Sequence, residues 1–254
     1  MSVRVERQGA VVTIVIDRPE RRNAVDPATA AALRAAFDGF EADGSASVAV
    51  LTGAGGHFCA GFDLKALAGD GADHDPLGEG PMGPTRRLPA KPVLAAVEGY
   101  AVAGGMELAL GCDMRIVAES ATFGIFCRRW GVPLIDGGTV RLPRIVGQGR
   151  ALDLILTGRP VGAAEALAIG LANRVVPEGR ARAEAEAIAA EIARFPQSCL
   201  RADRASALAA FDGDLRQALV AEAIGGDAAA REGAREGAAR FAAGLGRSGD
   251  YGEI

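Results

Sequence analysis

Two glycine-centred segments decide the fold: His57-Phe-Cys-Ala-Gly-Phe-Asp-Leu64 and Gly99-Tyr-Ala-Val-Ala-Gly-Gly-Met-Glu-Leu108. Each follows an apolar run typical of a buried strand, Val48–Thr52 before the first and Pro92–Val97 before the second. Each also leads into a predicted helix, whose first N–H groups have no intrahelical partner. Glycine lets the backbone turn sharply and approach a ligand closely. Two such helix starts that face each other would aim two N–H donors at one oxygen, an oxyanion hole that suits a thioester enolate better than a phosphate.

The bulk composition indicates an ordinary globular enzyme or binding protein. A chain of 254 residues is near the upper size for one hydrophobic core, so we expect one domain with a terminal elaboration. The net charge of -4 argues against nucleic acid or an anionic membrane as the main partner. No apolar run is long enough to cross a bilayer, and charged residues from Arg4 onward do not resemble a signal peptide.

The cysteines and histidines do not follow a metal-binding pattern. The four cysteines are scattered, with no CxxC pair, at Cys59, Cys112, Cys127 and Cys199. Reduced thiols in a cytoplasmic protein are the expectation. With only His57 and His74 in the chain, a histidine metal site or a Ser-His-Asp triad is poorly supported.

The first half of the chain has the pattern of an α/β fold. Val3–Arg7 and Val11–Asp17 predict a hairpin, and Asp26-Pro27 predicts the start of a helix that runs to about Ala42. Strands near 47–52, 92–98 and 113–118 alternate with helical segments, as in βα units around a mostly parallel sheet. The Gly-, Asp- and Pro-rich stretch from Gly69 to Pro84 predicts an exposed, mobile loop that shapes the mouth of a site.

The second half becomes mostly helical. Helices are predicted over Gly149–Thr157 and Val161–Ile169, with Gly170 as a helix stop and Ala172–Val176 as a last strand. From Gly179 the chain is rich in Ala, Arg and Glu, which predicts helices that break at Phe195-Pro196 and Asp212-Gly213.

Several motifs, in their order and spacing, resemble the crotonase family (the enoyl-CoA hydratase/isomerase superfamily) over nearly the whole chain. The matching pieces are Asp17–Ala24, Phe58–Leu64, the segment around Gly104–Glu107, Cys112-Asp113, Gly137–Pro143, Leu156–Gly158 and Gly170–Pro177. The resemblance implies an α/β spiral of ββα units over residues 1–195, with a helical section over 196–254 that forms a trimer or a dimer of trimers. It also implies an acyl-CoA thioester substrate and no metal or redox cofactor, coenzyme A being part of the substrate.

The resemblance assigns roles to residues of the two glycine segments. The oxyanion donors would be the backbone N–H groups of Phe62 and Gly104, and the Phe62 side chain would wall the acyl pocket. Glu107 would be a catalytic carboxylate, since an exposed surface glutamate is unattractive in its apolar setting. A plainer reading is that the glycines only permit tight turns, and both readings are compatible.

Residues next to the first segment would bind coenzyme A. In similar proteins the stretch that corresponds to Ala60 with Asp63, Leu64 and Lys65 lines the adenine and phosphate end, and Arg21 and Arg22 are candidates for a phosphate contact. The alternative for these cations is that they are simply solvated in turns.

The chain departs from the family pattern at the second catalytic acid. Hydratases of this family use two glutamates around a water, and the second position aligns with Cys127. A thiol in an apolar pocket is a weak acid, so a buried, inert cysteine is the favoured interpretation. Asp136 is the next candidate acid, one residue beyond the place where some relatives have an aspartate, and it could instead cap the helix that begins near Gly138.

Enoyl-CoA hydratase is the leading functional hypothesis. A double-bond isomerase is the alternative, because one carboxylate base can serve it, and decarboxylation or thioester hydrolysis on the same scaffold stays open. A CoA-ester binding protein without turnover is a hypothesis of a different class. A nucleotide-binding dehydrogenase is disfavoured, since Gly99–Gly104 lacks the G-x-G-x-x-G spacing.

Overall fold

The computed structural model describes residues 2–69 and 75–246, and the chain divides into two compact units, Met1–Ala189 and Ala190–Ile254. The division falls inside the helix α7 (Ala181–Arg194), whereas the boundary predicted at residue 195 lies just after that helix.

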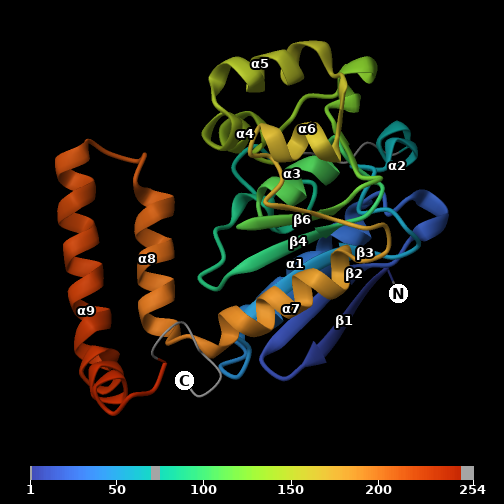
Figure 1. The fold of residues 1–254 in the computed structure, drawn as a ribbon. Helices are drawn as coiled ribbons and strands as arrows, with labels where there is room; N and C mark the ends of the chain where they lie inside the picture. The colour runs from blue at the N-terminus through green and yellow to red at the C-terminus, as the bar shows by residue number, and fades with distance from the viewer. Residues whose placement is uncertain (1, 70–74, 247–254) are drawn as a thin grey trace. The chain divides into compact units, whose positions relative to one another are not determined.

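A six-stranded sheet forms the base of the first unit. Its strand order is β1-β2-β3-β4-β6-β9, with β1 and β2 antiparallel and every later neighbour parallel (Figure 1). The strands are β1 (Val3–Gln8), β2 (Val11–Ile16), β3 (Val48–Gly53), β4 (Val93–Val97), β6 (Met114–Ala118) and β9 (Arg174–Val176). The predicted hairpin and parallel strands are therefore confirmed, and the β-branched run Val11–Ile16 is buried on both faces.

A second, smaller sheet lies beside the main sheet in the chain's ββα repeat. It contains β5 (Tyr100–Val102), β7 (Thr122–Gly124) and β8 (Pro160–Gly162). Along the chain, β4 lies in the main sheet, β5 follows in the small sheet, and the helix α3 comes next. The strands β6 and β7 then lie in the main sheet and the small sheet in the same order. The α/β spiral of ββα units that the resemblance implied is confirmed.

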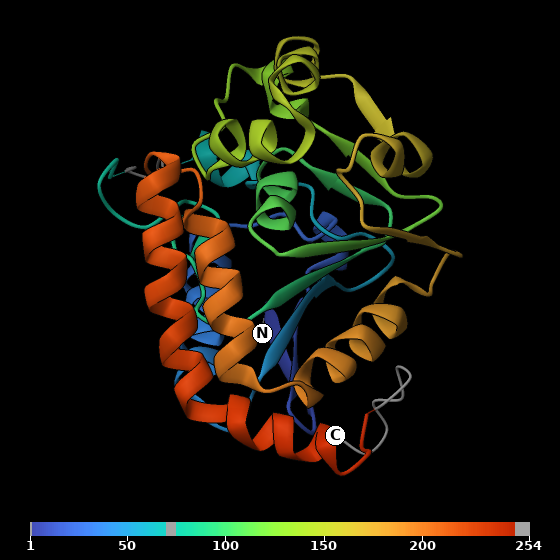
Figure 2. The same cartoon turned by 60° about the vertical axis from the view of Figure 1, so that its left-hand side comes forward.

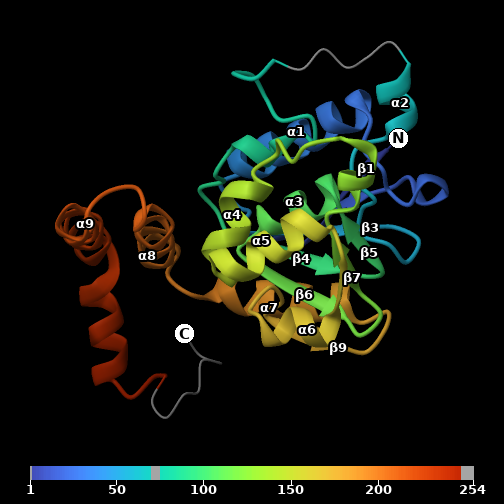
Figure 3. The same cartoon turned by 90° about the horizontal axis from the view of Figure 1, so that it is seen from above.

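The helix α3 (Gly104–Leu110) lies inside the first unit, and its seven residues are all buried. α3 packs against α4 (Gly138–Val146), and α4 packs against α5 (Gln148–Thr157), on one side of the main sheet (Figures 1 and 3). The remaining helices are α1 (Pro27–Ala42), α2 (Leu64–Ala68) and α6 (Ala163–Ala168). Asp26 caps α1 by accepting a hydrogen bond from the Thr29 N–H, as its sequence predicts.

Two local predictions hold only in part. The stretch Val161–Ile169 is not all helix: its start belongs to β8, which pairs with β7, and α6 begins only at Ala163. The predicted exposed loop from Gly69 to Pro84 is buried at its end, from Met82 to Pro84, because this end packs against the first unit's core. Residues 70–74 of that loop lie outside the described residues.

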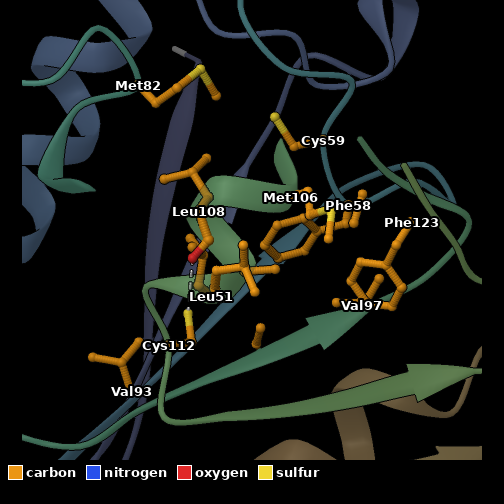
Figure 4. Close-up of a cluster of buried hydrophobic side chains, with 14 of the residues drawn as sticks. Leu51, Phe58, Cys59, Met82, Val93, Val97, Met106, Leu108, Cys112 and Phe123 are labelled. Carbon is orange, nitrogen blue, oxygen red and sulfur yellow. Dashed lines mark hydrogen bonds between the residues drawn. The ribbon is translucent and has the colours of Figure 1, made fainter. Parts of the chain in front are cut away.

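The core joins α3 to both sheets. Met106 lies near Phe58 and Phe123, while Met82 enters the cluster from the segment before the short helix η2 (Pro84–Arg86) (Figure 4). This packing places α3, with Gly104 and Glu107, on a rigid support.

The second unit is a helical hairpin. α8 (Gln197–Ala209) and α9 (Leu215–Ala242) lie side by side (Figure 2), and Asp214 and Gln217 form a capping box at the start of α9. The breaks predicted near Pro196 and Gly213 are confirmed. Within the described part of the chain, no helix combines the length and apolar character needed to cross a membrane.

Candidate active site

The two glycine turns lie against each other in the first unit. Cys59 N–H donates to Tyr100 O (2.9 Å) and Val102 N–H donates to Cys59 O (3.1 Å), which ties the two segments together. A Cβ atom on Gly61 would lie 3.0 Å from the Gly104 nitrogen, and Gly61 has φ +95°. Glycine is therefore required at this position by both the close approach and the backbone conformation.

The geometry of the backbone leaves two N–H groups for a ligand. Val25 N–H donates to Gly61 O and Asp63 N–H donates to Val25 O, each at 2.8 Å, and successive N–H groups of an extended chain alternate in direction. The Phe62 N–H therefore points away from Val25. Gly104 begins α3, so its N–H has no intrahelical partner. Among the residues that the structure describes, neither N–H donates a backbone hydrogen bond.

Ala103 adds strain at the same turn. It precedes α3 with φ 53° and ψ −126°, a conformation that a non-glycine residue rarely adopts. Its N–H donates to Gly124 O at 2.8 Å, which anchors the turn to β7. Strained backbone that is held by its surroundings is typical of functional sites.

Glu107 lies one helical turn after Gly104 and is buried, with 3% of its surface exposed. Its Oε1 atom accepts hydrogen bonds from the backbone N–H of Asp136 (2.9 Å) and of Gly138 (2.8 Å). A Cβ on Gly138 would lie 3.0 Å from the Glu107 side chain, so glycine at the start of α4 permits this contact. Glu107 is thus a buried carboxyl in one fixed orientation.

Burial raises the pKa of Glu107 to about 7. This net value also includes the charge of nearby Asp136, which raises the pKa, and the two N–H donors and Arg141, which lower it. A carboxyl with this pKa accepts and returns a proton readily near neutral pH, which is the requirement for a general acid–base.

A cavity of about 380 Å³ connects these groups. Of the residues expected at the site it is lined by Ala60, Phe62, Leu64, Gly104, Glu107, Cys127 and Asp136. Much of the remaining lining is apolar and includes Met82, Phe126 and Trp130. The two backbone turns at Phe62 and Gly104 and the buried Glu107 therefore line one cavity, and its largely apolar wall suits an acyl chain.

The other expected coenzyme A residues lie outside the cavity lining. The Asp63 side chain caps α2 by accepting from the Lys65 N–H (3.1 Å) and pairs with Arg18 (3.4 Å), so it has a structural role there. Lys65, Arg21 and Arg22 are exposed, and the Arg22 guanidinium lies 5.7 Å from the centre of the Tyr100 ring. Ala60 N–H donates to Arg22 O (3.0 Å), which places Arg22 beside the cavity residue Ala60.

Cys127 lies in the short helix η3 (Phe126–Trp130) and is 7% exposed. Burial, and then the charge of Glu107, raise the pKa of its thiol. Arg128 donates to Ile155 O (3.1 Å), and Arg129 lies over the Phe126 ring at 4.7 Å. The thiol at this position is therefore protonated at neutral pH.

Asp136 does not cap α4, so that alternative is wrong. The N-cap of α4 is Gly137, with no side-chain capping bond. The Asp136 carboxylate instead accepts hydrogen bonds from Met82 N–H (3.0 Å) and from the Thr85 hydroxyl. Sequence reasoning missed Met82 and Thr85 because they lie in a segment that lacks any periodicity.

Comparisons with known proteins identify the family. The family model described as enoyl-CoA hydratase/isomerase matches residues 6–243. An enoyl-CoA hydratase of Mycobacterium tuberculosis is 41% identical over 79% of this chain and 79% of its own length. A probable enoyl-CoA hydratase of Rhizobium meliloti is 43% identical over 75% of each chain, and a carnitinyl-CoA dehydratase of Proteus mirabilis is 40% identical over 76% of this chain and 74% of its own.

The solved structures agree with this assignment. A crystal structure of an enoyl-CoA hydratase from Mycobacterium tuberculosis has a TM-score of 0.90 at 36% identity and covers 95% of each chain. Another from Mycobacterium marinum has a TM-score of 0.89 at 37% identity, again over 95% of each chain. The chain belongs to the enoyl-CoA hydratase/isomerase family.

Proposed function

We propose that the chain adds water across the double bond of an enoyl-CoA thioester, and that Glu107 carries the proton in both directions. One observation carries the proposal: a buried carboxyl whose pKa is about 7 faces the same cavity as the Phe62 and Gly104 backbone turns. The names of the similar proteins favour hydration over double-bond isomerisation or binding without turnover.

The reaction balances with the groups of this chain and one water. The thioester oxygen accepts hydrogen bonds from the Phe62 and Gly104 N–H groups. The ionised Glu107 takes a proton from water as the water oxygen bonds to the β-carbon, and the electron pair of the double bond moves through the α-carbon to the thioester oxygen. The enolate then takes the proton from Glu107 at the α-carbon, the thioester carbonyl forms again, and Glu107 returns to its ionised state.

Only one carboxylate is needed for this cycle because the proton removed from water is the proton delivered to carbon. The protonated Cys127 thiol has only a packing role in the cavity wall, which agrees with its burial and its raised pKa. The cycle uses no metal and no redox step, so we propose that coenzyme A, as part of the substrate, is the only cofactor-like group involved.

The coenzyme A moiety is proposed to lie along Ala60 and Leu64, two of the cavity residues on the first glycine segment. Exposed Lys65, Arg21 and Arg22 would then contact its phosphates, because Lys65 follows Leu64 directly and Arg22 adjoins Ala60 through a backbone hydrogen bond. Asp63 would act indirectly, by holding the start of α2.

The function is tested by incubating the purified protein with crotonyl-CoA. Loss of the enoyl absorbance, with a product heavier by one water, is the expected result. A 3-enoyl-CoA is the matched alternative substrate: its conversion to the conjugated isomer, without any hydration of crotonyl-CoA, would contradict the proposal and establish an isomerase.

We expect the protein to be a homotrimer or a dimer of trimers. The second unit exposes a series of large apolar side chains, which include Leu208, Leu215, Leu219, Val220 and Ile224. Exposed apolar surface of this kind favours association with another chain. Sedimentation or light scattering at micromolar concentration should give a mass of three or six chains, and a monomer would contradict the expectation.

A reducing compartment such as the cytoplasm is proposed for this protein. Cys59, Cys112 and Cys127 are free thiols buried in the first unit, and Cys199 is an exposed free thiol. Free thiols of this kind persist where thiols are kept reduced.

A further inference from the structure

Residues 80–86, here called the wall segment, line the cavity through Gly80, Pro81 and Met82 and are held by Asp136. Gly83 N–H donates to Gly80 O (2.9 Å), which closes a turn, and Met82 sits on it with 1% of its surface exposed. The Asp136 Oδ1 atom accepts from both the Met82 N–H and the Thr85 hydroxyl, so a single carboxylate oxygen holds two points of the wall segment.

The fit between the wall segment and Asp136 is tight. A Cβ atom on Gly80 would lie 2.3 Å from Asp136 Oδ1 and 2.2 Å from the Thr85 hydroxyl oxygen. No other residue type could therefore occupy position 80 without moving the carboxylate or the hydroxyl. The contact of Asp136 with the wall segment therefore depends on glycine at position 80.

Met82 connects this contact to the oxyanion turn. A Cβ atom on Gly104 would lie 2.5 Å from the Met82 sulfur and 2.7 Å from its Cγ atom, so the thioether packs directly on Gly104. Met82 and Gly104 line the same cavity. The Met82 side chain therefore limits the space next to the backbone N–H that is proposed to hold the thioester oxygen.

Asp136 also contacts Glu107, but through its backbone. Its N–H donates to Glu107 Oε1 at 2.9 Å, while its carboxylate points to Met82 and Thr85. One residue thus sets the orientation of Glu107 with its main chain and the position of the wall segment with its side chain.

We propose that Asp136 is a positioning residue for acyl-chain selectivity: its carboxylate holds the wall segment so that Met82 restricts the cavity beside Gly104. The inference rests on the proposed function. It assigns the Asp136 carboxylate to the cavity wall, where the sequence offered it as a substitute catalytic acid, and it makes Met82 the residue that touches the acyl group.

The first test separates positioning from acid–base catalysis at Asp136. In Asp136→Asn the amide oxygen still accepts from Met82 and Thr85, and only the negative charge on the acceptor is lost. The two hydrogen bonds are then weaker, so kcat for crotonyl-CoA should fall by less than about tenfold. A loss of about 10²–10⁴ in kcat would show that the carboxylate itself moves a proton and would overturn the proposal.

The second test asks whether Asp136 acts through Met82. The measured quantity is the ratio of kcat/KM for a long-chain enoyl-CoA to kcat/KM for crotonyl-CoA. Met82→Ala should raise this ratio by about tenfold, because the shorter side chain leaves room for several carbon atoms. Asp136→Ala should raise the ratio in the same direction, since the wall segment is then free to move Met82 away from Gly104.

The double variant Asp136→Ala/Met82→Ala decides between the two accounts. If Asp136 acts through Met82, the double variant has the selectivity ratio of Met82→Ala alone. Multiplication of the two single effects, or no change of the ratio in Asp136→Ala, would overturn the proposal. Arg141 donates to Asp136 O (3.0 Å) and to Thr85 O (2.6 Å), so removal of the carboxylate releases the Met82 end of the wall segment while its Thr85 end stays joined to the backbone of Asp136.

Two further variants keep the test sharp. Thr85→Val removes the hydroxyl that donates to Asp136 but keeps the shape of the side chain. It should raise the selectivity ratio, as expected for Asp136→Ala, and it replaces Asp136→Ala in the test if Asp136→Ala does not fold. Asp38→Asn is the matched control: Asp38 is an exposed aspartate that pairs with Arg87, just beyond the wall segment, and it should leave the ratio unchanged. Absence of hydration by the unmodified protein would instead reject the proposed function.

Discussion

Glu107→Gln is expected to lower kcat for enoyl-CoA hydration by a factor of about 10²–10⁴, the usual contribution of a positioned general acid–base. Glutamine keeps the shape of the side chain, and its amide oxygen still accepts from the Asp136 and Gly138 N–H groups. Only the ability to take a proton from water and return it to carbon is lost. Steady-state kinetics with crotonyl-CoA measure the effect, and KM should change little.

Cys127→Ala and Glu119→Gln are the controls for this loss. Cys127 is the residue at the place of the second family acid, and its replacement should cost little if the thiol only packs in the cavity wall. Glu119 is an exposed glutamate outside the cavity, so its variant controls for removal of a charge. Full activity of Glu107→Gln together with loss of activity in Cys127→Ala would assign the chemistry to the thiol.

Removal of the Phe62 N–H alone is expected to lower kcat by a factor of about 10²–10³, the cost of losing one oxyanion-hole donor. Replacement of Phe62 by phenyllactic acid makes this change, because the backbone amide becomes an ester while the aromatic ring stays in the cavity wall. The ester keeps Gly61 O as an acceptor for the Val25 N–H, although a weaker one than in the amide, and the bond from the Asp63 N–H to Val25 O is unchanged, so the turn should keep its position.

The same amide-to-ester change at Phe211 is the matched control. Phe211 lies in the connection between α8 and α9 and is exposed, so an ester there should leave kcat unchanged. Unchanged hydration with the ester at Phe62 would show that the thioester oxygen is held elsewhere. A loss that appears in KM alone would show that the N–H binds the ground state and the transition state equally.

The sequence predicted most of the main sheet and of the helices because local signals there agree with the tertiary structure. β2 and β3 are mostly apolar and almost wholly buried, and α1 starts at a residue pair, Asp26-Pro27, that suits a helix N-terminus. Gly61 and Gly104 were recognised for the same reason, since a turn between a buried strand and a helix leaves a clear pattern.

The loop that contains the wall segment was predicted, but its burial was not, because nothing local determines that burial. Its burial depends on Asp136, which lies about fifty residues later in the chain, and on the packing of Met82 against Gly104. Gly- and Pro-rich sequences favour turns but do not encode what covers them. The same reason explains the wrong helix at Val161, because β8 exists only through its pairing with β7.

The pH dependence of kcat/KM for crotonyl-CoA tests the central claim most directly, because kcat/KM reports the ionisation of the free enzyme. Hydration requires ionised Glu107, whose pKa is about 7, so kcat/KM should rise tenfold per pH unit below that value and level off above it. Measured from about pH 5 to about pH 9, this single rising limb is the predicted result, with protein stability checked at each pH. A profile that is flat across this range, or that falls as the pH rises through 7, would contradict a buried glutamate as the group that takes the proton from water.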